Sequence, residues 1–329
     1  MPSRAGDGRP VFLEDAMEFF TVSLINGTIY GLLLFMVSAG LTLIFGMMGV
    51  LNFAHTSFYM VGAYLAYTLQ KFIGFWPAVI IAPLIVGLLG VVVERWFLRR
   101  VHRYGHAHEL LLTFGLSFII AEIIKLFFGN YPVNYQVPAS LSFAAFRLFG
   151  TDYPFYRLMM GLVSLLMFGL IYLLLSRTRI GIVVRSAIYR PAMAETLGHN
   201  VPLVFMGVFG VGAALAGLAG AIAGAFYTTN PNMALELGVL VFVVVVIGGL
   251  GSLEGAMLSS ILIGLISSFA VGVDVSLADA LDYVGAGQWA RDLGGLMTLK
   301  VSSLAATIPF ALMLLVLLVR PSGLMGEKE

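Results

Sequence analysis

Long apolar runs separated by short polar segments make up most of this chain. A helix needs about 20 apolar residues to cross the roughly 30 Å hydrocarbon core of a bilayer. On that criterion we predict six membrane-spanning helices, in the runs Phe19–Phe45, Phe72–Val93, Leu110–Phe128, Leu158–Leu175, Val201–Ala225 and Leu304–Val319. The segments between these runs then determine how the spans are connected.

Further apolar stretches are interrupted by glycine and polar residues. Gly46–Gln70 carries several polar side chains, and the glycine-rich stretch Gly248–Ser252 divides two short runs. Those two runs are Leu237–Ile247 and Ala256–Val273. We predict short or broken membrane helices here, so the fold class is an all-α polytopic integral membrane protein with eight or nine transmembrane or broken helices. Gly46–Tyr64 and Gly248–Gly264 are analogous breaks in the two halves of the chain, which suggests a diverged internal duplication.

Composition agrees with a membrane protein and excludes cysteine chemistry. Hydrophobic residues make up 60% of the chain and charged residues 11%, whereas about a quarter of the residues of a soluble domain are charged. The chain has no cysteine, which excludes disulfides, thiolate metal sites and a thiol nucleophile. The first apolar run is too long for the core of a cleaved signal peptide, so we expect none.

Arginine and lysine cluster in alternate connecting segments, which predicts the orientation of the spans because such residues stay in the cytoplasm. We expect segments 94–109 and 177–200 and the tail 321–329 to be cytoplasmic, and segments 129–156 and 274–300 to be periplasmic. Residues 1–18 then form an N-terminal tail and 19–320 a single transmembrane domain. Nine segments place the N-terminus outside and the C-terminus inside, and eight would move the N-terminus. We expect segment 129–156 to pack as an irregular cap, and 274–300 to be either an amphipathic interfacial helix or a solvated linker.

Three polar residues stand close together in the first broken stretch. Asn52, His55 and Thr56 lie among small residues at membrane depth, and broken helices of this kind often line a substrate path. The alternative is that these side chains only hydrogen-bond within the helix bundle. We predict a substrate pathway formed by Asn52, His55 and Thr56 together with Gly248, Gly249, Gly251 and Ser252. The glycines of the second break do not form a phosphate-binding loop, because no Gly-Lys-Ser/Thr follows them.

The polar segment between Leu175 and Val201 has the pattern of a short amphipathic helix, kinked at Pro191 and ending at Gly198. Its residues at helical spacing are Ile182, Val183, Ser186, Tyr189, Met193, Thr196 and Leu197. The membrane spans contain almost no acidic residue that could couple transport to an ion, so we expect another polypeptide to supply the energy. We predict that this segment docks on an ATPase through Arg185, Ser186, Arg190 and Glu195. The alternative is a basic helix that only satisfies the charge rule.

Four motifs, in this order, are similar to those of the permease subunits of branched-chain amino acid ABC importers, the LivH type. They lie in Leu51–Tyr64, Thr178–Gly198, Val246–Ala256 and Val319–Gly326. The resemblance implies a bacterial inner-membrane importer with a second related permease (LivM-like), two cytoplasmic ATPase subunits that bind ATP and magnesium, and a periplasmic binding protein. It also implies that the solute is a branched-chain amino acid, urea, a short amide or a small organic acid. Apart from membrane lipid we expect no other partner, no nucleic acid and no cofactor in this chain.

Two functions of other classes stay open on the sequence. A secondary carrier or a channel would work as this polypeptide alone. A membrane-embedded enzyme would need a reactive cluster at one depth, but His102, His106 and His108 lie in a basic loop and the other two histidines lie elsewhere. We therefore expect no catalytic residue and no metal site.

Overall fold

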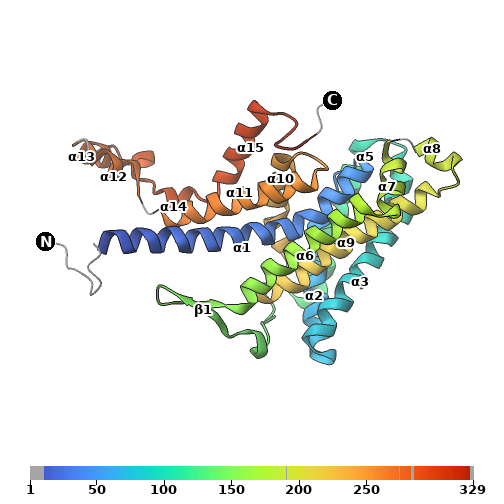
Figure 1. Cartoon of the computed structure of the whole chain (residues 1–329), viewed down its shortest axis with the longest axis horizontal. Helices are drawn as coiled ribbons and strands as arrows, with labels where there is room; N and C mark the ends of the chain where they lie inside the picture. Colours follow the sequence, from blue (N-terminus) through green and yellow to red (C-terminus); the bar gives the residue numbers. More distant parts are fainter. Residues whose placement is uncertain (1–10, 190, 274, 283–284, 327–329) are drawn as a thin grey trace.

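Helices account for most of the computed structural model, which describes residues 11–189, 191–273, 275–282 and 285–326 (Figure 1). The long helices in chain order are α1 (Val11–Met48), α2 (His55–Ile73), α3 (Phe75–Val93), α5 (His106–Phe128), α6 (Phe155–Arg177), α9 (Val201–Phe226), α10 (Met233–Gly248) and α11 (Leu253–Gly272). The short ones are α4 (Arg99–His102), α7 (Arg179–Tyr189), α8 (Pro191–Thr196), α12 (Leu277–Asp282), α13 (Gly287–Leu293), α14 (Val301–Leu304) and α15 (Ile308–Val319). The predicted polytopic helical fold is confirmed.

Six helices of the described chain are long and apolar enough to cross a membrane. They are Met17–Met48, Phe75–His102, His106–Phe128, Phe155–Arg177, Val201–Phe226 and Leu253–Gly272. The first five confirm five of the predicted spans. The sixth, α11, was expected to be short or broken, and it is a full span because its small polar residues remain within the helix.

The predicted span Leu304–Val319 is a single helix only from Ile308 onward. The chain there forms α14 and then α15, which has only 12 residues and is therefore about 18 Å long. Pro309 stands in the first turn of α15, where its missing N–H is tolerated, whereas inside a continuous helix it would remove a hydrogen bond. The helix therefore begins at Ile308, just before the proline, and residues 304–307 of the apolar run lie before it.

The predicted break in Gly46–Gln70 is present after Met48. Residues 49–54 are not helical, and α2 begins at His55 beside Val37, which lies in the interior of α1. Val37 is 11 residues before the end of α1, a distance of about 16 Å along the helix axis. The chain therefore turns back along α1, and α2 starts at the depth of the middle of α1. We call residues 49–54 the re-entrant segment.

The connecting segments gather at two opposite ends of the bundle (Figure 1). Arg99 contacts Pro202, and His106 lies beside Gly49 at the end of α1. The end of α1 also packs, through Gly46, on the turn Gly248–Ser252, which contacts Gly326. Segment 94–109, the start of α9 and the C-terminal tail therefore lie at one end, called here the arginine-rich end. Segment 129–156, α12 and α13 lie at the other end, called here the hairpin end, where the described part of α1 also begins. The described chain thus has six candidate spans and the two shorter apolar helices α10 and α15, and the choice between eight and nine segments stays a prediction.

Both segments at the hairpin end contain regular structure. Instead of an irregular cap, segment 129–156 contains the antiparallel hairpin of β1 (Ala144–Leu148) and β2 (Thr151–Pro154). Its turn has positive φ at both central residues, Phe149 and Gly150, and this matches the twist of a hairpin. Segment 274–300 contains the two short helices α12 and α13 and not one interfacial helix, and in α12 Leu277 is exposed while Ala278 is buried.

Helix α9 lies at the centre of the packing. Its Gly212 is in contact with Gly40 of α1 and its Gly217 with Gly62 of α2, so closely that a side chain at Gly40 or Gly62 would overlap the facing backbone. Small residues allow such close approach between membrane helices. The backbones of α1, α2 and α9 therefore contact one another directly, and little side-chain adjustment is possible between them.

Candidate functional site

The re-entrant segment keeps its backbone polar groups satisfied at membrane depth, as a non-helical chain must where water is excluded. The N–H of Ala54 donates to Oδ1 of Asn52 at 3.0 Å, and the N–H of Phe53 donates to Oγ1 of Thr113 at 3.3 Å. Thr113, on α5, is completely buried. One side chain of the segment and one of the neighbouring helix thus hold it in place.

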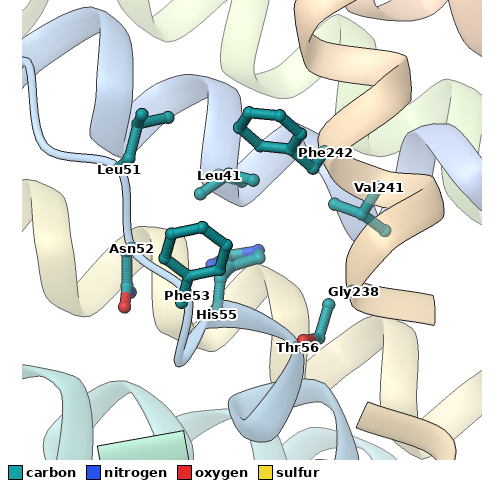
Figure 2. Close-up of a pocket in the computed structure, with 9 residues that line it drawn as sticks. All are labelled: Leu41, Leu51, Asn52, Phe53, His55, Thr56, Gly238, Val241 and Phe242. Atoms are coloured by element: carbon teal, nitrogen blue, oxygen red, sulfur yellow. The ribbon is translucent and has the colours of Figure 1, made fainter. Parts of the chain in front are cut away.

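A pocket lies against this segment, between α1, α2 and α10 (Figure 2). It is lined by Leu41, Leu51, Asn52, Phe53, His55, Thr56, Gly238, Val241 and Phe242. The structure thus brings the predicted residues Asn52, His55 and Thr56 together at one pocket. Its free volume is about 30 Å³, which leaves room for a water molecule or two but not for an amino acid.

The polar side chains of the pocket are nearly inaccessible and are only partly hydrogen-bonded. Asn52, His55 and Thr56 are 3%, 1% and 5% exposed. His55 Nε2 lies 3.0 Å from the carbonyl oxygen of Val37 and must donate to it, because a carbonyl can only accept. In the neutral ring Nδ1 is then an acceptor, and neither this atom nor Nδ2 of Asn52 has a partner within the described residues. Unpaired polar atoms in a buried place are unusual and point to a functional role.

Aromatic side chains close the pocket on one side. The ring of Phe53 stacks on that of Phe242, with centroids 6.2 Å apart, and meets the ring of Phe114 edge-on at 6.1 Å. Phe53 comes from the re-entrant segment and Phe242 from α10, so two elements that are distant in sequence form this wall (Figure 2). A change in the spacing of α2 and α10 would therefore change the size of the pocket.

The turn Gly248–Ser252 does not line this pocket. It forms a tight turn between α10 and α11: Gly249 and Gly251 have positive φ, and the hydroxyl of Ser252 accepts a hydrogen bond from the N–H of Gly255 at 3.0 Å. Gly251 packs on the backbone of Gly46 at the arginine-rich end, so the two predicted breaks contact each other there. Gly238, in the pocket wall, is ten residues before Gly248, about 15 Å away along α10. The pathway role of these glycines and of Ser252 stays a prediction.

The polar segment 177–200 is helical on both sides of residue 190, which lies outside the described residues: α7 ends at Tyr189 and α8 begins at Pro191, where the kink was predicted. Buried small residues, Val184, Ala187 and Ala194, attach it to the bundle. In the expected apolar stripe, Ile182, Met193 and Leu197 are 58%, 53% and 72% exposed. The buried face is made of small side chains because alanine packs closer to a neighbouring backbone than larger side chains can. The segment therefore presents large apolar side chains outward.

The predicted coupling residues lie on this segment with different surroundings. Arg185 donates from Nη1 to the carbonyl oxygen of Leu175 at 2.7 Å, which satisfies a carbonyl at the end of α6. Ser186 is half-buried and Glu195 is exposed. Arg190 lies outside the described residues. The coupling role of all four residues stays a prediction.

The model of the family described as "Branched-chain amino acid transport system / permease component" matches residues 23–318. The chain belongs to this family. Over 320 residues this permease is 28% identical to the high-affinity branched-chain amino acid transport system permease protein BraD of Pseudomonas aeruginosa, covering 93% of the chain and 95% of BraD. It is 26% identical to the corresponding LivH protein of Escherichia coli strain K12 over 340 residues, covering 96% and 99%. A probable LivH of Methanocaldococcus jannaschii is 29% identical over 250 residues, covering 73% and 78%. The predicted resemblance is confirmed.

Two buried carboxylates of the permease were missed in the sequence. Glu94 lies in the π-helical turn Glu94–Leu98 after α3 and pairs with Arg99, and Glu109 in the first turn of α5 contacts Nδ1 of both His102 and His106. The signal that could have found them is their position, since each is an isolated acid within a basic loop. No three histidine, cysteine, aspartate or glutamate side chains in the described chain are arranged to hold a metal ion.

Proposed function

We propose that this permease is the membrane-spanning subunit of an ATP-driven importer that carries branched-chain or other hydrophobic amino acids across the bacterial inner membrane. The observation that carries the proposal is the family match, because it covers the re-entrant segment, the pocket and segment 177–200 together. The names of BraD and LivH, both high-affinity branched-chain amino acid transport system permeases, support the class of solute. The chain itself catalyses no covalent step.

The proposed orientation places the arginine-rich end in the cytoplasm. Segments 94–109 and 177–200 lie there with the C-terminal tail, and their arginines favour the cytoplasmic side. Two ATPase subunits, which bind ATP and magnesium, dock on segment 177–200 through its outward apolar side chains and through Arg185, Ser186, Arg190 and Glu195. A second, LivM-like permease pairs with this one, and a periplasmic binding protein delivers the solute to the hairpin end.

The proposed pathway runs by Asn52, His55 and Thr56. A pocket of about 30 Å³ cannot hold an amino acid, so the structure corresponds to a state in which the pathway is closed at this point. Transport by alternating access opens the pocket transiently to each side. The partly unpaired polar atoms of Asn52 and His55 then offer a donor and an acceptor to a passing solute.

Reconstitution tests the proposal. The permease, its proposed partner permease, the two ATPase subunits and the binding protein are placed in liposomes with labelled leucine and magnesium-ATP. Uptake is expected only with all components and ATP. Uptake by this chain alone without ATP would show that it is a carrier or a channel.

A charge reversal tests the coupling role. Arg185→Glu is expected to lower the ATP hydrolysis that accompanies transport, and Arg100→Glu, at the same end but outside segment 177–200, serves as the control. Equal hydrolysis in the Arg185 variant and the wild type would remove Arg185 from the ATPase contact.

A further inference from the structure

We propose that Glu94 and Arg99 form a positioning ion pair. When segment 177–200 moves, this pair makes the end of α3 at the arginine-rich end move with it, and the movement is transmitted toward the pocket. The proposal rests on the proposed function, since it assigns a role in energy coupling to residues outside the ATPase contact and outside the pocket.

At the arginine-rich end, the pair connects the π-helical turn that holds Glu94, helix α4 that begins with Arg99, and the first turn of α9. Arg99 donates from Nη2 to one carboxylate oxygen of Glu94 at 2.8 Å and from Nε to the other at 3.2 Å. The same Nη2 donates to the carbonyl oxygen of Pro202 at 2.8 Å, in the first turn of α9. Glu94 is 2% exposed, and it lies in a π-helical turn of the kind that often marks functional sites. A bidentate guanidinium fixes both distance and direction, so the pair orients α9 against the end of α3.

The first turns of α9 are also where segment 177–200 is attached. Ala187 of α7, Ala194 of α8 and Val201 of α9 form one buried cluster. Val184 of α7 packs with Val208 of α9 in a second cluster. A displacement of α7 and α8 therefore acts first on the part of α9 whose Pro202 carbonyl is held by Arg99.

Close contacts connect α9 to the pocket through α1 and to α3. Gly210 contacts Gly87 and Val91 of α3, and Gly212 contacts Gly40 of α1, which in turn lies against the ring of His55. These contacts join glycine backbone to another backbone, to the side chain of Val91 or to the buried ring of His55, and elements packed this closely shift together. Arg99 thus acts on the pocket through α9 and α3, and it is a positioning residue.

The first test measures the ratio of solute transported to ATP hydrolysed in the reconstituted complex. In Arg99→Gln we expect this ratio to fall about fivefold or more, the range of typical coupling between sites. In Glu94→Gln/Arg99→Gln we expect a ratio close to that of the single variant, because residues that act as a pair are non-additive. Arg100→Gln is the matched control, since Arg100 is the next residue, is exposed and makes no ion pair within the described chain.

Parallel loss of transport and hydrolysis, with an unchanged ratio, would mean that the pair only stabilises the fold and would overturn the proposal. If Arg99→Gln does not assemble, Arg99→Lys replaces it. Lysine keeps the charge but cannot make the bidentate contact and the bond to Pro202 together, so its ratio is also expected to fall. A wild-type ratio in Arg99→Lys would overturn the proposal as well.

The second test does not depend on the ATPase. Hydrogen exchange of residues 191–205 is compared in the purified wild-type permease and the Arg99→Gln variant. We expect faster exchange in the variant, because the start of α9 has lost the group that holds its Pro202 carbonyl. Unchanged exchange refutes the positioning role whatever the complex transports. Faster exchange together with a wild-type complex that needs no ATP would instead refute the proposed function alone.

Discussion

Gly238 forms part of the pocket wall, and its replacement by valine tests whether solute passes there. A Cβ built on Gly238 lies 3.0 Å from the hydroxyl oxygen of Thr56, so any side chain at this position points into the space beside the predicted pathway residues (Figure 2). The two methyl groups that valine adds there take up space in a cavity that has room for a water molecule or two. The substitution therefore fills the pocket.

The expected effect follows from the energy of overpacking. Forcing additional carbon atoms into a packed interior costs about 1–3 kcal/mol. The gain from replacing glycine in a helix by valine is only a few tenths of a kcal/mol. If the pocket must open by this additional amount for each solute molecule, transport slows by about 5- to 150-fold, since about 1.4 kcal/mol corresponds to a factor of ten.

Uptake of labelled leucine by the reconstituted complex measures this effect. Gly115→Val on α5 is the matched control, because nothing lies within 4 Å of a Cβ built on Gly115. The control is expected to transport like the wild type, and both variants are expected to assemble with the partner subunits. Wild-type transport by an assembled Gly238→Val complex would show that solute does not pass through this pocket.

Two further changes test local structure. Thr113→Val removes the acceptor of the Phe53 N–H and should lower the stability of the detergent-solubilised permease by about 1–3 kcal/mol, seen as a lower melting temperature, whereas Thr113→Ser keeps the hydroxyl and should not. In the segment at the hairpin end, hydrogen bonds from the hydroxyl and the N–H of Ser276 hold the pKa of Asp279 below its usual value. A lowered folded pKa gives stability that is present above the unfolded pKa of about 3.9 and is lost as the pH falls further. Proteolysis of this segment should therefore increase below about pH 4, with a smaller pH effect in Ser276→Ala; an equal pH effect in both would remove Asp279 as the cause.

The membrane spans were predictable because the length of an apolar run is enough to identify one. A run as long and apolar as Val201–Ala225 can bury its backbone only as a membrane helix, so α9 follows from the sequence. The run Leu304–Val319 was predicted in the same way, but its helix begins only at Ile308, because Pro309 is tolerated in the first turn of a helix and not in its interior. The hairpin of β1 and β2 was not predictable by turn signals, because its turn uses Phe149 where asparagine or aspartate is usual.

The candidate site was predictable as a set of residues but not as a geometry. Polar residues at membrane depth marked Asn52, His55 and Thr56, and they do meet at one pocket. Nothing in the sequence showed that Gly238 and Phe242 form the facing wall, since that depends on how α10 crosses α2. The same limit applies to Glu94, whose pairing with Arg99 depends on a π-helical turn without a sequence signal.

The packing also indicates which wall of the pocket moves. Helix α9 touches the backbones of α1, α2 and α3, so these four helices are expected to move as one body. The wall that α10 contributes faces α2 where Gly238 lies beside Thr56, whereas the other end of α10 is joined to α1 through α11, because Gly248 packs on Gly255 and the backbone of α11 lies against that of α1. Access to the pocket should therefore change through movement of α10 relative to α2, and not through sliding of α3 along α9.

Two engineered disulfides separate these possibilities in a chain that has no cysteine of its own. A Cβ built on Gly238 lies 3.9 Å from Cβ of Thr56, and one built on Gly87 lies 3.0 Å from Cβ of Ala214. The first distance is within the usual disulfide range of about 3.5–4.5 Å, and the second needs a shift of a few tenths of an ångström. Oxidation of Thr56→Cys/Gly238→Cys should stop transport until a reductant is added. Oxidation of Gly87→Cys/Ala214→Cys should leave transport unchanged, because it joins helices that already move together. The opposite pair of outcomes would mean that α9 slides along α3 during transport and that α10 is part of the fixed body.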